Sequence, residues 1–332
     1  MSNKKKQFID YPVGRTFGLS GVPDEVSIVG FAPNQHPNTP KSTSSYVFRR
    51  EFLRELIGFL SEPEGDAFYV AGPTGSGKTS GITEVLARLN WPCQQVTAHG
   101  RLELADLIGQ FKLVSSAPGA VPEMEFVYGV LPNAMKYGHI LLINELDYAD
   151  PSEISGLNDV IEGRPLVITE NGGEVIQPHP MFRLIATGNS IGGGDDSGLY
   201  RGVMAQNIAF MDRFRFSVVG YMDKVSEEKL LGTLVPGMPG KLRQMLVEVA
   251  NAIRTQFLGE SGTGADGTLS VTMSTRTLVR WAKLCATYRE HSSPLEYALS
   301  LSLTRRAEPS EAVAIEKIAS SILGDQWVAD NS

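Results

Sequence analysis

One octapeptide constrains the fold of this chain more than any other feature. It consists of Gly72, Pro73, Thr74, Gly75, Ser76, Gly77, Lys78 and Thr79. An apolar run, 67–71, precedes it, and a segment of helical character, 78–89, follows it. Glycines allow a loop to wrap closely around a phosphate with its backbone N–H groups pointing inward, and the following helix directs its positive end at the anion. The octapeptide therefore predicts a strand–loop–helix unit that binds nucleotide phosphates.

Two residues of this loop have defined chemical tasks. We expect Lys78 to reach the β- and γ-phosphates and the Thr79 hydroxyl to ligate Mg²⁺. A glycine-rich turn that matched by accident would not need a buried strand before it and a helix after it, which is the context that this motif requires. The sequence therefore predicts ATP and Mg²⁺ as cofactors.

A second apolar run, 140–143, is followed by polar residues that suit a metal ion and a water molecule. Glu145 follows this run, and a carboxylate there is placed to polarise the attacking water, so we expect it to be catalytic. The residue before it is Asn144, where an aspartate is usual. Its amide can bind Mg²⁺ through a water molecule but adds no negative charge, which predicts weaker metal affinity and slower turnover. The alternative is a core strand that ends in polar residues.

Five short apolar runs alternate with helical stretches along the chain. Most are continuous rather than alternating, as in strands that are buried on both faces of a parallel sheet. The alternation predicts an open α/β sheet with right-handed crossovers. The predicted strands are 67–71, 94–97, 140–143, 182–187 and 216–220, and the predicted helices include 46–60, 78–89 and 152–161.

Three regions depart from this alternation. Residues 1–44, rich in Pro, Gly, Ser and Asn, predict an extended arm that packs on the body in places. Segments 111–128 and 166–176 each hold two β-prone pieces around a turn, and both predict hairpins. After residue 225 strand signals vanish and helical spacing dominates. The expected parts are the arm 1–44, an α/β nucleotide-binding domain 45–224 with two hairpin insertions, and an all-helical domain 225–332.

Composition excludes several classes of protein. The net charge of −7 argues against a nucleic-acid partner, because neutralising phosphates requires clustered Lys and Arg. Cys93 and Cys285 lie far apart and form no spacing pattern, so neither a disulfide framework nor a zinc site is expected. No apolar stretch approaches the ~18 residues of a membrane span, and the polar N-terminus lacks the apolar core of a signal peptide. These features predict a cytoplasmic protein without a membrane partner.

Five further short motifs occur along the chain in a characteristic order. They are 87–92, 178–189, 198–200, 211–214 and 273–277. Together with the octapeptide they resemble AAA+ ATPases of the MoxR branch, in particular the CobS type, the ATPase subunit of aerobic cobaltochelatase. The resemblance runs from about residue 45 to about residue 290 and leaves 1–44 unmatched. It implies a P-loop AAA+ three-layer core with a five-stranded parallel sheet, followed by a small helical lid domain.

The resemblance also implies roles for three polar residues. Asn189 matches sensor 1, which holds the attacking water near the γ-phosphate; the alternative is a strand-end turn residue. Arg213 matches the arginine finger that reaches a neighbouring subunit's nucleotide, with Arg215 as the competing candidate and a surface ion pair as the alternative. Arg276 matches sensor 2, and the alternative is a helix-start arginine without nucleotide contact.

An arginine finger that acts on a neighbour requires an oligomer, so the resemblance implies a ring, expected to be a hexamer. In MoxR-type rings the two hairpins face the pore or the partner. Three functions stay open. The chain is the motor of a cobalt chelatase with a von Willebrand A-domain partner, a CobS-like chaperone for another client such as a phage or mobile-element assembly, or a nucleotide-gated scaffold in which Asn144 makes hydrolysis slow.

Overall fold

The computed structural model describes residues 7–33, 36–43, 46–115, 121–194, 202–257 and 269–327. Contacts between residues divide the chain into two units. Unit 1 comprises Met1–Thr43, Phe48–Gly72 and Lys78–Val219, and unit 2 comprises Ser44–Val47, Pro73–Gly77 and Gly220–Ser332. We keep the three-part division 1–44, 45–224 and 225–332 as a proposal.

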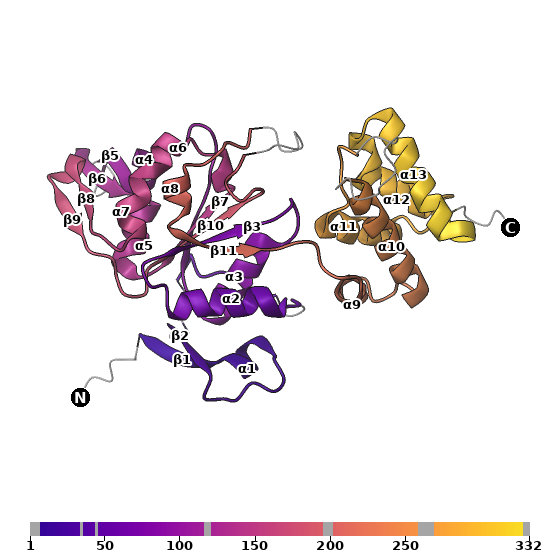
Figure 1. Cartoon of the computed structure of the whole chain (residues 1–332), viewed down its shortest axis with the longest axis horizontal. Coiled ribbons are helices and arrows are strands. Elements are labelled where there is room, and N and C mark those ends of the chain that lie inside the picture. The colour runs from indigo at the N-terminus through magenta and orange to yellow at the C-terminus, as the bar shows by residue number, and fades with distance from the viewer. Residues whose placement is uncertain are drawn as a thin grey trace. The chain divides into compact units, whose positions relative to one another are not determined.

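Unit 1 is built around a five-stranded parallel sheet with the order β11-β3-β10-β7-β4 (Figure 1). The strands are β3 (Ala67–Ala71), β4 (Cys93–Thr97), β7 (Ile140–Asn144), β10 (Arg183–Gly188) and β11 (Phe214–Val218). Ile185 in β10 pairs with Phe68 on one side and with Leu142 on the other. The three inner strands are buried on both faces, which explains their continuous apolar sequence. The predicted α/β fold class is therefore confirmed.

The last strand begins two residues earlier than the prediction of 216–220. β11 lies at the edge of the sheet, and its first side chains change from the buried Phe214 to the partly exposed Arg215 and the exposed Phe216. A partly solvated edge strand does not need a continuous apolar run. The start of β11 therefore has no apolar run that would predict it.

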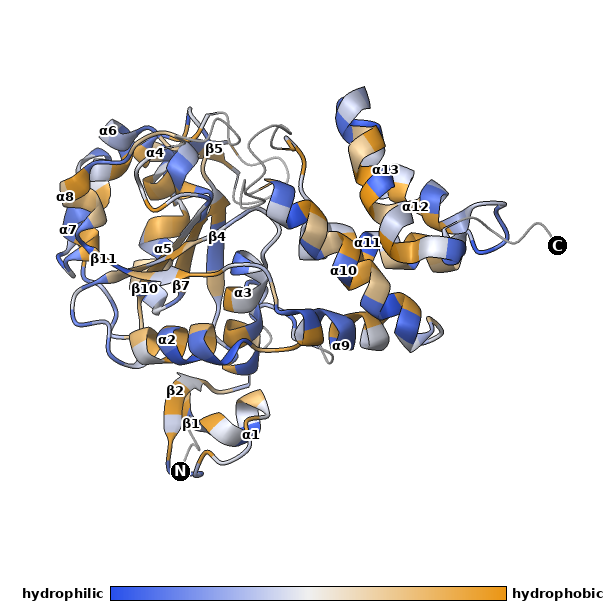
Figure 2. Cartoon of the chain, turned by 45° about the vertical axis from the view of Figure 1, so that its right-hand side comes forward, coloured by the Kyte–Doolittle hydropathy of each residue, from blue (hydrophilic) through white to orange (hydrophobic). Residues whose placement is uncertain are grey.

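Helices cover both faces of the sheet. Side chains of successive strand residues point to opposite faces, so that Phe68 and Val70 pack in one buried cluster and Tyr69 in the other. The first cluster includes α2 and α3, and the second includes α4 and α5. Figure 2 shows apolar and polar residues alternating along α2, as expected for a helix with one buried face. The helices are α2 (Arg50–Ser61), α3 (Lys78–Arg88), α4 (Leu104–Ile108), α5 (Val130–Tyr137), α6 (Pro151–Ile154), α7 (Asn158–Ile161) and α8 (Ile208–Met211).

The helix predicted over 152–161 is interrupted. A 3₁₀ turn, η2 (Ser155–Leu157), separates α6 from α7. Gly156 lies in this turn, and a Cβ atom there would come within 2.4 Å of the Leu104 side chain. Close packing against Leu104 and the low helix propensity of glycine account for the break.

The two predicted hairpins are present in unit 1. The first consists of β5 (Gly109–Val114) and β6 (Glu123–Tyr128), and residues 116–120 between them lie outside the described ranges. The second consists of β8 (Leu166–Ile168) and β9 (Glu174–Ile176), with η3 (Thr169–Asn171) between them. Figure 1 shows the two hairpins close together, and the Tyr128 hydroxyl donates to the Glu174 carboxylate at 2.6 Å.

The N-terminal region is more regular than the extended arm predicted for 1–44. β1 (Phe8–Pro12) and β2 (Ser27–Phe31) form an antiparallel pair, with α1 (Val13–Phe17) between them. The Phe31 N–H donates to the carbonyl of Leu89 at 3.0 Å, and Phe17 and Ile28 are buried in the cluster of α2 and α3. Packing on the body was expected, whereas the paired strands were not.

Helices form the described C-terminal part of unit 2. They are α9 (Lys224–Leu234), α10 (Gly240–Phe257), α11 (Thr275–Thr287), α12 (Pro294–Ser302) and α13 (Pro309–Leu323), with 3₁₀ turns at η4 (Thr304–Arg306) and η5 (Gly324–Gln326). Their core includes Ile253, Trp281 and Leu299. Among the described residues of the whole chain, no helix is both long and apolar enough to cross a membrane.

Candidate active site

The loop Gly72–Gly77 joins β3 to α3 at the carboxyl end of the sheet. Its backbone has left-handed torsions at Gly75 (φ 69°) and Gly77 (φ 93°), which side chains with a Cβ adopt only at a cost. The Ser76 N–H donates to the carbonyl of Pro73 at 3.2 Å, so the loop curls back on itself. The glycines at these positions therefore follow from the shape of the loop.

Lys78 is the first residue of α3 and is only 6% exposed. Its Nζ donates to the carbonyl of Gly72 at 2.6 Å and to Oδ1 of Asn189 at 3.1 Å, both of which are neutral oxygens. The amino end of α3 contributes a partial positive charge at the same place. A buried ammonium beside a helix amino terminus creates a site that favours an anion, so these residues fit a phosphate group.

The next residue, Thr79, connects α3 to the end of β7. Its hydroxyl donates to Oδ1 of Asn144 at 2.7 Å. A hydroxyl oxygen and an amide oxygen are hard, uncharged metal ligands. Mg²⁺ usually has at least one carboxylate ligand besides water and phosphate oxygens. Thr79 and Asn144 therefore fit a magnesium ion whose charge is balanced mainly by nucleotide phosphates.

Glu145 directly follows β7 in an unusual backbone conformation. Its φ of 56° lies in the left-handed region, which costs a residue with a side chain on the order of 1–3 kcal/mol. Its N–H donates to Oγ1 of Thr187 at 3.2 Å, and its Oε2 accepts a hydrogen bond of 2.6 Å from Nδ2 of Asn189. Such strain is typical of functional sites, and it places the carboxylate beside Asn189.

Asn189 follows β10 and connects Lys78 with Glu145. Its oxygen accepts from Lys78 and its nitrogen donates to Glu145. The structure thus brings together five of the predicted residues from three neighbouring segments. They are Lys78, Thr79, Asn144, Glu145 and Asn189.

The sequence prediction missed two residues that support this network. Thr187 accepts the N–H of Glu145. Asp147, which is fully buried, accepts the N–H groups of Asn189 and Ser190 through Oδ2 at 2.7 and 3.1 Å. Burial raises the pKa of the Asp147 carboxyl, while the two amide donors lower it. An aspartate two residues after Glu145 gives no signal of its own in the sequence, because carboxylates are common after strands.

Arg213 lies immediately before β11, at the end of the parallel sheet where its strands begin. Its guanidinium forms an ion pair with Glu162 at 2.6 Å and donates to the carbonyl of Ala209. The Lys78 network lies at the carboxyl ends of the strands. One strand length, roughly 16 Å, therefore separates it from Arg213. Arg213 therefore does not join the network of its own chain.

The competing candidate, Arg215, is in β11. It forms ion pairs with Glu64 at 2.9 Å and with Asp66 at 2.6 Å. Asp66 immediately precedes β3, which also places this guanidinium at the amino edge of the sheet.

Arg276 belongs to unit 2. It is exposed in the first turn of α11, whose N-cap is Ser274, with a side chain that accepts from the Thr277 N–H at 3.1 Å. This placement agrees with the expected helix start, and a contact with nucleotide stays a proposal.

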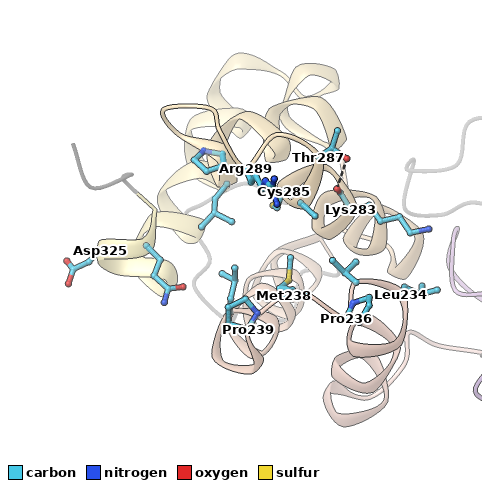
Figure 3. A pocket seen from close by; sticks show the side chains of 16 residues that line it. Leu234, Pro236, Met238, Pro239, Lys283, Cys285, Thr287, Arg289 and Asp325 are labelled. Carbon is cyan, nitrogen blue, oxygen red and sulfur yellow. Dashed lines mark hydrogen bonds between the residues drawn. The ribbon is translucent and has the colours of Figure 1, made fainter. Parts of the chain in front are cut away.

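Unit 2 also contains a cavity of about 1030 Å³, shown in Figure 3. Its walls are largely apolar and include Leu234, Met238 and Cys285, with Lys283 and Arg289 among its polar lining. Burial raises the pKa of the Cys285 thiol to about 12, so the thiol is inert at neutral pH. None of the predicted site residues lines this cavity.

A glycine loop that leads from a buried strand into the helix of Lys78, with acidic and amide side chains at the ends of neighbouring strands, defines a P-loop nucleotide-binding protein. Residues 67–214 match the family described as an AAA domain of the dynein-related subfamily, and residues 227–322 match the family described as CbbQ/NirQ/NorQ C-terminal. The aerobic cobaltochelatase subunit CobS of Sinorhizobium sp is 33% identical over 250 residues, which cover 74% of this chain and 72% of that protein. The chain belongs to the MoxR family of AAA+ ATPases.

Other similarities are shorter or more distant. A protein of Staphylococcus haemolyticus is 36% identical over 152 residues, 46% of this chain and 54% of the relative. Among solved structures, a RuvB mutant of Thermotoga maritima matches with a TM-score of 0.49 and 13% identity over 88% of this chain and 76% of that one. The RuvB Holliday junction branch migration motor of the same organism matches with a TM-score of 0.46 and 12% identity, covering 89% of this chain and 76% of that one. Structural matches at this level add nothing to the family assignment.

Proposed function

We propose that this chain hydrolyses ATP with Mg²⁺ at a site completed by a neighbouring copy, and that it uses the energy to remodel a partner protein. The observation that carries the proposal is the position of Asn189, which is hydrogen-bonded to both Lys78 and Glu145. Hydrolysis needs a cation at the phosphates and a group that orients and activates water, and this network supplies both from one chain.

The predicted site residues have defined tasks under this proposal. The loop Gly72–Gly77, Lys78 and Thr79 hold the nucleotide, which supplies the phosphoanhydride bond when it is bound. Glu145 polarises the attacking water, and Asn189 orients that water by a hydrogen bond. Arg276 contacts the nucleotide as sensor 2. These assignments rest on family resemblance together with the geometry of the Lys78 network.

Arg213 acts in trans under this proposal. Its place at the amino edge of the sheet, roughly one strand length from the phosphate loop of its own chain, supports contact with a neighbour's nucleotide. A finger used in trans requires an oligomer, for which we propose a closed hexameric ring. The ion pair with Glu162 must open or shift for the guanidinium to reach a neighbour.

Two observations bear on the client. The hairpins expose apolar side chains, including Leu113 (72%) and Met124 (71%) on the first and Val175 (54%) on the second. Exposed apolar side chains of this kind favour contact with a protein. The similarity to CobS supports a cobalt chelatase role with a von Willebrand A-domain partner in the cytoplasm. A CobS-like chaperone acting on another client is the alternative.

Asn144 favours a second candidate function, a nucleotide-gated scaffold with very slow hydrolysis. The neutral amide beside Thr79 lacks the charge that a carboxylate would contribute to Mg²⁺ binding. Steady-state phosphate release by the wild-type chain and by Glu145→Gln separates the two functions, with Glu170→Gln, an exposed carboxylate on η3, as the matched control. The motor requires turnover that Glu145→Gln abolishes and the control retains. Equal background rates in all three proteins support the scaffold.

A further inference from the structure

Asp147 is fully buried two residues after Glu145, and none of the roles above uses its carboxylate. One of its oxygens, Oδ2, accepts two backbone hydrogen bonds, from Asn189 at 2.7 Å and from Ser190 at 3.1 Å. The backbone it holds belongs to the residue whose side chain contacts Lys78 and Glu145. The carboxylate therefore fixes the main chain of Asn189, whose side-chain amide links Lys78 with Glu145.

The turn that carries Asp147 is itself held firmly. It forms η1 (Leu146–Tyr148), which begins directly after Glu145. The Asp147 carbonyl accepts the Met204 N–H at 2.8 Å. On the other side, a Cβ atom at Gly188 would lie 3.1 Å from the Asp147 carboxyl carbon and 1.8 Å from the Tyr69 hydroxyl. The missing side chain of Gly188 thus lets the Tyr69 hydroxyl and the Asp147 carboxyl approach the β10 backbone closely.

The energetics favour a specific role over general packing. A buried carboxylate is costly unless donors satisfy it, and an N–H group that is withdrawn from water without an acceptor also costs free energy, though less. Oδ2 supplies the acceptor for both N–H groups, while Oδ1 has no hydrogen-bond partner in the described residues. The contribution of this side chain is thus concentrated on the backbone of Asn189 and Ser190.

We propose that Asp147 is a positioning residue, which holds Asn189 in register with Glu145 and Lys78 and thereby sets the rate of ATP hydrolysis. The inference rests on the proposed ATPase function. Asp147 acts only through Asn189 and contacts neither the nucleotide nor the attacking water. A displacement of about 1 Å in a positioned group is enough to cost roughly 10²-fold in rate, so loss of this anchor acts on turnover more than on binding.

The test compares full-length variants. Asp147→Ser shortens the side chain and removes the acceptor from the two N–H groups. Asp147→Asn keeps one oxygen that can accept both. Asp150→Ser is the matched control, because Asp150 caps α6 by accepting the Ser152 N–H and serine is an equally good cap. For each protein, kcat, KM, the Kd of a fluorescent ATP analogue and the melting temperature are measured.

Asp147→Ser is expected to lower kcat by about 10- to 100-fold with Kd changed less than about 3-fold. Asp147→Asn and Asp150→Ser stay within about 3-fold of the wild-type kcat. Combining Asp147→Ser with Asn189→Ala adds less than about 3-fold to the effect of Asn189→Ala alone, since both act through one group. A purely structural role would lower the melting temperature and impair binding, and its effect would add to that of Asn189→Ala.

The inference is overturned if Asp147→Ser hydrolyses at the wild-type rate, or if its defect persists in full in the Asn189→Ala background. Should Asp147→Ser fail to fold, Asp147→Asn decides. A folded, nucleotide-binding Asp147→Asn that loses more than about 10-fold in kcat shows that charge rather than the acceptor matters, which also overturns the inference. Absence of hydrolysis by the wild-type chain instead contradicts the proposed function itself.

Discussion

The side chains of Asn189 and Glu145 are joined by a hydrogen bond of 2.6 Å from the amide to the carboxylate. The other end of the same amide accepts a hydrogen bond from Lys78. One neutral side chain thus connects the cation expected at the phosphates with the carboxylate expected to polarise water. The distances between these groups depend on where Asn189 is held.

Asn189→Ala should reduce kcat with little effect on nucleotide affinity. Removing one positioned polar group of this kind costs about 10²–10³-fold in rate, whereas Lys78 and the glycine loop still bind the phosphates. Single-turnover hydrolysis and equilibrium binding of a fluorescent ATP analogue separate the two effects. A variant that binds and turns over like the wild type would show that Asn189 is only a strand-end residue.

Asn144→Asp should lower the Mg²⁺ concentration at which hydrolysis is half-maximal. The new carboxylate lies beside the Thr79 hydroxyl and adds the negative charge that the amide lacks. A Mg²⁺ titration of phosphate release at saturating ATP measures the change. An unchanged or higher half-maximal concentration would mean that Asn144 is not near the metal.

Arg254→Ala should destabilise unit 2. Arg254 and Glu227 form a buried ion pair at 2.8 Å, with 4% and 0% of their side chains exposed. Removing one partner leaves an uncompensated buried charge, which costs about 3–5 kcal/mol of unfolding free energy. Arg289→Ala is the control, because Arg289 and Glu290 are exposed and 3.8 Å apart. Urea denaturation of both variants checks the difference, and equal stability would contradict the assignment.

Stability should fall on acidification because of His139. Burial, and the neighbouring His36 and His179, lower the pKa of His139 from 6.5 to about 4. The unfolded chain therefore binds a proton that the folded chain does not between these values. Above pH 6.5 the imidazole is neutral in both states and does not affect stability, whereas the free energy of unfolding decreases as the pH falls towards 4, by at most about 3 kcal/mol.

His139→Gln should reduce this dependence, because glutamine does not titrate. Thermal melting at pH 7 and pH 5 measures the change, with His291→Gln, an exposed histidine of unit 2, as the control. An equally steep loss of stability in His139→Gln would show that other groups cause the acid sensitivity.

The central strands and the phosphate loop were predictable because their physical requirements act on local sequence. The buried part of a strand that is covered on both faces must be apolar, as residues 140–143 of β7 are, and a loop with left-handed torsions at Gly75 and Gly77 needs glycine. The edge strand β11 and the broken helix over 152–161 were predicted less well. Their form depends on solvent exposure and on the contact between Gly156 and Leu104, which are set by tertiary packing.

The same distinction holds within the site. Lys78, Thr79 and Glu145 lie in short motifs whose residue types and spacing predict their function. Asp147 and Thr187 contribute through contacts with the N–H groups of Asn189 and Glu145, respectively. Such contacts between segments about 42 residues apart have no local sequence signature. The predictions that remain open concern Arg213 and Arg276, whose proposed partners are a neighbouring copy and the nucleotide.

The most direct test of a site shared between neighbouring copies is a mixing experiment with two variants. Glu145→Gln and Arg213→Ala are each expected to be inactive as pure preparations. When they are mixed in equal amounts and allowed to exchange, some interfaces pair an intact Glu145 with an intact Arg213 from the neighbour. Random assembly restores such pairing at about a quarter of the sites, so the account predicts phosphate release at about that fraction of the wild-type rate. A mixture that stays as inactive as its components, although the chains are shown to exchange, would contradict it.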